Sequence, residues 1–206
     1  MSAPSLLERE RELRVIDERL DEAVAGRGGL VLIEGPAGIG KSALLARARE
    51  AARARGVPVA AARGSELEHA DAFGVVRQLF EPRLRAMRAA DRERLLGGAA
   101  ALAAPVVLPE TAPSAAGDGS SFATLHGLYW LVAGLAAERP QLLLVDDVHW
   151  ADEASVRFLL FLVNRLEDAP VLLLAAQRHR TGAVRDDEDG GDAPQPRLPQ
   201  ARHPLA

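Results

Sequence analysis

One short segment and its flanks constrain the fold of this 206-residue chain most strongly. Eight consecutive residues match the pattern GxxxxGK followed by Ser or Thr at every fixed position: Gly35, Pro36, Ala37, Gly38, Ile39, Gly40, Lys41 and Ser42. The apolar run at residues 30–33 precedes them and is too short for a buried helix. Residues 41–55 are rich in Ala, Leu and Arg and stop at Gly56, as a helix does. The order strand, glycine loop, helix is the context that this pattern requires.

The chemistry of this pattern is phosphate binding. Its glycines let the backbone form a nest of N–H groups too close to phosphate oxygens for any Cβ atom, and the helix N-terminus adds partial positive charge. We therefore predict that residues 35–42 bind the phosphates of ATP or ADP, with Lys41 at the β- and γ-phosphates and the Ser42 hydroxyl on Mg²⁺. The alternative is a glycine-rich turn that fits the pattern by chance.

An acidic pair follows a second apolar run, residues 142–145. Because ligands bind at the carboxyl ends of parallel strands, we predict that Asp146 completes the magnesium site. Asp147 either orients or deprotonates the attacking water, or only caps a loop or the helix that follows. Arg178 comes just after the last predicted strand, where it is either a sensor of the γ-phosphate or a solvated arginine.

Apolar periodicity alternates strands with helices along the chain. Strands are predicted at residues 30–33, 57–62, 142–145 and 171–175. Further helices are predicted at residues 13–24 with a Ser5–Glu8 capping box, 73–80 closed by Pro82, 83–96, 122–135 capped by Ser120 or Ser121, and beyond an Asp152 cap. Residues 97–119 are expected to be irregular. This alternation predicts an α/β fold, a three-layer αβα sandwich around a mainly parallel sheet.

The composition changes near Arg180. Residues 186–189 are all acidic, and four prolines crowd the stretch from 194 to the end. Such a segment cannot bury enough apolar surface to offset the entropy of ordering it. We therefore predict one core domain at residues 1–180 and a disordered tail at residues 181–206.

Charge and cysteine content exclude several classes of protein. The formal net charge is −4, and the arginines alternate with acids, so we predict no direct binding to nucleic acid by this chain. The absence of cysteine excludes disulfides, thiolate metal sites and cysteine nucleophiles. The N-terminus is charged, and no apolar run approaches the roughly 18 residues of a membrane span. We expect a soluble, cytoplasmic protein without a membrane partner.

Five segments carry a family resemblance: LLERERELRVIDERL, GPAGIGKS, GSELEHADAFGVVRQLFEP, ATLHGLYWLVAGL and LLLVDDVHWADEAS. Together they resemble the ATPase domain of large actinobacterial LuxR-type transcriptional regulators, members of the STAND class of AAA-related signalling ATPases, over residues 5 to about 180. The resemblance implies that the strand ending at Ala176 lies between the loop strand and the Asp146 strand, which places Gln177 or Arg178 beside the γ-phosphate. It also implies a slow switch between ATP-bound and ADP-bound states.

The resemblance is incomplete after Arg180. Relatives continue with a further strand, a winged-helix lid, helical repeats and a DNA-binding helix-turn-helix, so we expect a truncated core whose sheet is incomplete at its C-terminal edge. An uncovered edge predicts self-association or pairing with full-length relatives. The leading hypothesis is an ATP-binding regulatory domain with slow magnesium-dependent hydrolysis and no DNA-binding part. The alternatives are a P-loop kinase acting on a small molecule and a non-catalytic interaction fragment.

Overall fold

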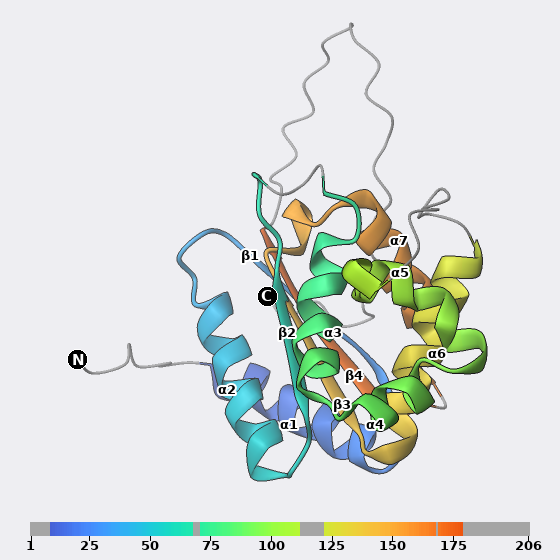
Figure 1. The fold of residues 1–206 in the computed structure, drawn as a ribbon. Coiled ribbons are helices and arrows are strands. Elements are labelled where there is room, and N and C mark those ends of the chain that lie inside the picture. Colours follow the sequence, from blue (N-terminus) through green and yellow to red (C-terminus); the bar gives the residue numbers. More distant parts are fainter. Residues whose placement is uncertain (1–8, 68–70, 112–121, 168, 179–206) are drawn as a thin grey trace, which may run out of the picture.

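The centre of the molecule is a four-stranded parallel sheet. The structure is a computed structural model that describes residues 9–67, 71–111, 122–167 and 169–178 (Figure 1). The strands are β1 (Gly29–Gly35), β2 (Val59–Arg63), β3 (Gln141–Asp146) and β4 (Val171–Arg178). Their spatial order is β1-β4-β3-β2, so the last strand lies between the loop strand and the Asp146 strand, as the resemblance implied.

Helices cover both faces of the sheet (Figure 1). The α-helices are α1 (Glu10–Val24), α2 (Lys41–Ala54), α3 (Gly74–Ala86), α4 (Ala89–Leu95), α5 (Ala104–Val107), α6 (Phe122–Glu138) and α7 (Glu153–Val163). Short 3-10 helices are η1 (Gly98–Ala103), η2 (Pro109–Thr111) and η3 (Val148–Trp150). The α/β fold class and the three-layer arrangement are therefore confirmed.

Alternate residues of each strand enter two separate cores. In β4, Leu172 and Leu174 pack with α1 and α2, whereas Leu173 and Ala175 pack with α3, α6 and α7. This alternation follows from the two-residue period of a strand, and burial on both faces explains why the strands read as continuous apolar runs. The sheet is thereby held rigidly, with its carboxyl ends directed toward the glycine loop.

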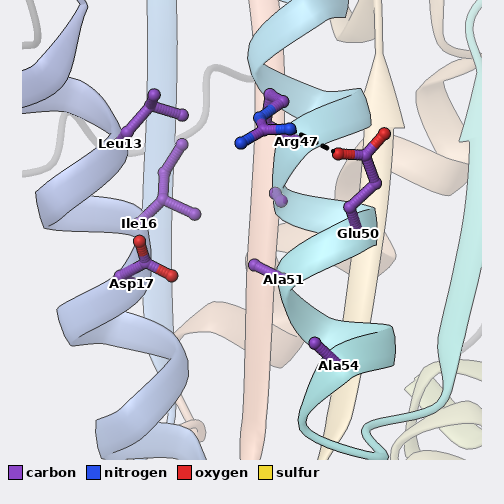
Figure 2. A pocket seen from close by; sticks show the side chains of 8 residues that line it. Leu13, Ile16, Asp17, Arg47, Glu50, Ala51 and Ala54 are labelled. Carbon is purple, nitrogen blue, oxygen red and sulfur yellow. Dashed lines mark hydrogen bonds and ion pairs between the residues drawn. The ribbon is translucent and has the colours of Figure 1, made fainter.

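A shallow hollow lies between the two helices of the smaller core, α1 and α2 (Figure 2). It measures about 270 Å³ and is lined by Leu13, Ile16, Asp17, Arg47, Ala48, Glu50, Ala51 and Ala54. The small alanines of α2 form its apolar floor, and the Arg47–Glu50 ion pair lies at its rim. The two helices thus run side by side, and α2 begins at the glycine loop.

The prediction that Pro82 closes a helix is wrong. Helix α3 continues through Pro82 to Ala86, and the break comes at Met87 and Arg88, whose backbones are extended. An interior proline costs about 3 kcal/mol because it removes a hydrogen bond and crowds the preceding turn. The buried stripe of α3 continues past the proline to Leu84, which is 1% exposed, and this burial keeps the helix intact.

The prediction of an irregular segment at 97–119 is also wrong where the structure describes it. Residues 98–111 form the successive short helices η1, α5 and η2. They pack closely on α6, because a Cβ atom at Gly127 would come within 2.7 Å of the Ala103 nitrogen. Small side chains on η1 and a glycine on α6 therefore permit a compact contact that local sequence signals do not reveal.

Several predictions concern residues outside the described part of the chain: the Ser5–Glu8 capping box, the caps at Ser120 or Ser121, and the disordered tail at 181–206. The predicted Asp152 cap of α7 is confirmed, since its carboxylate accepts the backbone N–H of Ser155 at 2.8 Å. Among the described residues, no helix has both the length and the apolar character needed to cross a membrane.

Candidate functional site

The carboxyl ends of the strands bring the predicted site residues to one edge of the sheet. In the parallel register, Gly35 at the end of β1 lies beside Arg178 at the end of β4. Asp146 at the end of β3 lies beside Arg63 at the end of β2. This is the edge at which open α/β sheets bind ligands. The topology therefore gathers residues that are more than a hundred positions apart in the sequence.

The glycine loop encloses the ammonium group of Lys41. Gly38 and Gly40 adopt the left-handed φ angles of +79° and +91° that favour glycine. Lys41 is only 7% exposed, and its Nζ donates to the carbonyl oxygens of Gly35 and Pro36, both at 2.8 Å. An ammonium has three N–H donors, so one remains beyond these two bonds. A buried cation inside a ring of backbone amides is suited to an anionic phosphate.

Ser42 and Asp146, the two predicted magnesium ligands, are in direct contact. The Ser42 Oγ donates to Asp146 Oδ2 at 2.7 Å. The other carboxylate oxygen, Oδ1, accepts the backbone N–H of Asp147 at 2.9 Å. A hydroxyl and a carboxylate are the hard oxygen donors that Mg²⁺ prefers. The described residues contain no cluster of three or more acidic, His or Cys side chains, which fits an ion that takes most of its remaining ligands from phosphates and water.

Asp147 makes a different contact. Its backbone is left-handed, with φ of +48°, and its Oδ2 accepts both Arg63 Nη2 at 2.8 Å and Arg63 Nε at 3.1 Å. The hydrogen bond and the attraction of Asp147 raise the pKa of Arg63. The side chain makes no capping bond to η3, and α7 is capped by Asp152, so the alternative that Asp147 is only a helix cap is wrong. Its predicted role toward water stays a prediction.

The end of β4 meets the loop through three side chains. Gln177 Nε2 donates to the carboxylate of Glu34, which precedes the glycine loop. The backbone N–H of Arg178 donates to His149 Nδ1 at 3.5 Å, while the Arg178 guanidinium is exposed and makes no bond to the described residues. Arg178 therefore lies next to Gly35 with its charge free, as a sensor requires.

His149 and its neighbour fill the space beneath this edge. Burial lowers the pKa of His149, so its imidazole is neutral near pH 7. Because Nδ1 accepts the Arg178 N–H, the ring proton is assigned to Nε2, which is buried and has no partner among the described residues. The Trp150 ring lies 5.2 Å from the imidazole at a tilt of 44°. Packing against His149 is thus the contact that the structure gives Trp150.

Sequence reasoning missed two arginines of this region. Arg63 is the first charged residue after β2, and its place at the same strand edge as Asp146 was the signal that could have indicated it. Arg9 precedes α1 and donates from Nη2 to the Ile39 carbonyl at 2.9 Å. No local pattern ties Arg9 to a loop that lies 30 residues away, so only the fold reveals this contact.

Comparisons with known proteins agree with this arrangement. The family model described as "AAA ATPase domain" matches residues 5–174. An uncharacterized protein of Rhizobium meliloti (strain 1021) is 50% identical over 50 residues, which are 24% of this chain and 5% of that protein, so the chain spans a small part of that relative. A chain from the structure of Drosophila ORC bound to GC-rich DNA and Cdc6 is similar over 87% of this chain and 55% of its own, with 15% identity and a TM-score of 0.34.

Proposed function

This chain belongs to the AAA ATPase domain family, and we propose that it is an ATP-binding regulatory domain with slow magnesium-dependent hydrolysis. One observation carries the proposal. The glycine loop that encloses Lys41 also brings Ser42 Oγ to 2.7 Å from the Asp146 carboxylate at the end of a neighbouring core strand. A phosphate cradle and a pair of magnesium ligands therefore share one strand edge.

Each loop residue has a defined part in nucleotide binding. Residues 35–42 supply backbone N–H groups and the N-terminus of α2 to the phosphates of ATP or ADP. Lys41 exchanges a carbonyl oxygen for a phosphate oxygen, which carries more charge and so makes the stronger bond. Ser42 and Asp146 would hold Mg²⁺, which neutralises charge on the phosphates when it is bound.

Lys41 is the only lysine in the sequence, and every other cationic residue of its class is an arginine. A compact ammonium on a flexible stem fits inside the loop, whereas a planar guanidinium with five donors requires more space and a different set of acceptors. The one position that uses lysine is thus the position where the loop closes around the side chain. This supports a binding role for Lys41 beyond its match to the pattern.

Slow hydrolysis is supported by the state of Asp147. A carboxylate that activates water needs an oxygen free to accept a proton. Both Arg63 donors occupy Asp147 Oδ2, and hydrogen bonds to the charged form make a carboxylate a weaker base. Arg178, with its free guanidinium beside Gly35, is the residue that we propose to respond to the γ-phosphate.

We also propose a finer assignment within the family. The five segments quoted above support an origin in LuxR-type transcriptional regulators of the STAND class, in which ATP and ADP favour different states of a signalling switch. In this proposal the protein acts in the cytoplasm, and DNA binding is not a function of this chain. Among the described residues β1 pairs with β4 alone, which supports self-association or pairing with relatives through its other edge.

Titration of the full chain with ATP, with and without Mg²⁺, tests the proposal. We expect magnesium-dependent binding, and Lys41→Ala should weaken it by roughly 100-fold because a buried, charge-assisted contact is lost. Lys41→Arg keeps the charge but not the shape and should also bind poorly. Arg47→Ala is the matched control, since Arg47 lies on the same helix in an exposed ion pair and should leave the affinity unchanged. A wild-type chain without affinity for any nucleotide would contradict the proposal.

A further inference from the structure

Arg9 connects the first helix to the phosphate loop. It precedes α1, and its guanidinium makes two hydrogen bonds at the same time. Nη2 donates to the carbonyl oxygen of Ile39 at 2.9 Å, and Nη1 donates to Glu12 Oε1 at 2.9 Å. One end of the fork therefore lies on the loop, and the other lies on the first turn of α1.

The Arg9–Glu12 pair differs in burial from similar ion pairs nearby. The side chains of Arg9 and Glu12 are 18% and 8% exposed, whereas those of Arg19 and Glu22, which have the same spacing on the same helix, are 44% and 40% exposed. A buried carboxylate is costly unless it is paired, so Glu12 fixes the position of the Arg9 guanidinium. The contact with the loop is thus made by an arginine whose orientation is already set.

The loop atom that Arg9 holds is a sensitive one. Ile39 lies between Gly38 and Gly40, both of which have positive φ angles, and glycines on each side leave the Ile39–Gly40 peptide freer to rotate. A trans peptide is planar, so its C=O and N–H groups point in opposite directions. When Arg9 holds the Ile39 carbonyl, it therefore also directs the Gly40 N–H away from itself. The Ile39 side chain is 43% exposed and takes no part in this contact.

We propose that Arg9, held by Glu12, is a positioning residue for phosphate binding. It keeps the Ile39–Gly40 peptide in one orientation, so the Gly40 N–H belongs to the loop's set of phosphate donors before a nucleotide arrives. Fixing a donor in advance increases affinity because the ordering cost is not paid on binding. This inference rests on the proposed nucleotide-binding function, and it assigns Arg9 no contact with the nucleotide.

The contact also works in the reverse direction. If Arg9 orders the loop, then a nucleotide that orders the loop must stabilise the Arg9 contact by the same free energy. Arg9 is joined to the first turn of α1 through Glu12. Nucleotide binding at the loop is thereby communicated to the start of α1, which packs alongside α2 (Figure 2).

The test compares Arg9→Ala with Arg19→Ala in the full chain. Both variants remove the arginine of an i,i+3 pair on α1, but only Arg9 reaches the loop. Arg9→Ala should weaken binding of both ATP and ADP by about five-fold, the effect of one misdirected donor, and Arg19→Ala should bind as the wild type does. Arg9→Lys should recover part of the affinity, because an ammonium keeps the charge but not the planar fork.

Hydrogen exchange gives a readout that a merely structural role would not change. ATP should slow exchange of the amides at residues 10–16 in the wild type and in Arg19→Ala, and should have no such effect in Arg9→Ala. Should Arg9→Ala misfold, Glu12→Gln provides the second variant, since it leaves Arg9 in place without its buried charged partner and should show a smaller loss of affinity. Wild-type affinity in Arg9→Ala overturns the inference alone, whereas a wild type that binds no nucleotide overturns the proposed function and the inference with it.

Discussion

Asp146 and Asp152 follow the same strand, six positions apart, and each holds a residue with an unusual backbone. The only non-glycine residues with positive φ in the described part of the chain are Phe73 and Asp147. Asp152 accepts the N–H of Phe73 at 2.7 Å, and Asp146 accepts the N–H of Asp147 at 2.9 Å. In both places a carboxylate offsets the cost of a left-handed residue.

The two aspartates differ in what their remaining capacity contacts. Asp152 is 3% exposed and also accepts backbone N–H groups of Ser155 at 2.8 Å and Val75 at 3.4 Å, so it joins the N-termini of α7 and α3. Asp146 instead contacts the Ser42 hydroxyl, which is itself a metal ligand by type. A carboxylate surrounded by backbone donors fixes the fold, whereas one bonded to an exchangeable hydroxyl can bind a ligand.

Asp152→Ala tests the structural side of this comparison and should have the largest effect. It leaves buried N–H groups at the starts of two helices without an acceptor and removes the cap of α7. We expect a loss of about 4 kcal/mol in the free energy of unfolding, measured by urea denaturation with circular dichroism. Asp152→Asn, which keeps one carbonyl oxygen, should lose about half as much. A loss under about 1 kcal/mol for Asp152→Ala would show that these bonds do not stabilise the junction.

Asp146→Ala tests the functional side and should show the opposite pattern. The free energy of unfolding should change by less than about 1 kcal/mol, because the bond to Ser42 is exposed. The increase in ATP affinity that Mg²⁺ gives should fall by about ten-fold, since one of two protein ligands is lost. Titrations with and without Mg²⁺ measure this directly. If the variant kept the full magnesium effect, Asp146 would not be a ligand.

The sequence alone predicted the parts of this molecule that depend on local pattern. The strand, loop and helix around Gly35–Ser42 could be predicted because the glycines, the lysine and the apolar run are consecutive. The parallel sheet followed from short apolar runs that alternate with helices. The position of β4 between β1 and β3 came from the family resemblance and was confirmed.

The parts that could not be predicted depend on contacts between distant segments. Asp152 could be predicted as the cap of α7, but not as an acceptor for Phe73, because that bond joins residues 79 positions apart. Helix α3 continues through Pro82 because its buried stripe continues, a fact of tertiary packing. The bonds of Arg63 to Asp147 and of Arg9 to Ile39 likewise exist only once the sheet has assembled.

Asp147 lies between the two cases and sharpens the comparison with the smallest expected effect. It is buried like Asp152, but its donors come from one exposed side chain, Arg63, and not from the backbone. Arg63→Ala removes both bonds and leaves Oδ2 free to accept a proton from water, so we expect phosphate release to rise by about three-fold. A continuous phosphate assay with saturating ATP and Mg²⁺ measures the rate. The rise should vanish when Asp147→Asn is added, since an amide cannot act as a base. A rise that survives in the double variant would mean that Arg63 acts on the nucleotide and not through Asp147, which would then belong with Asp152 as a structural carboxylate.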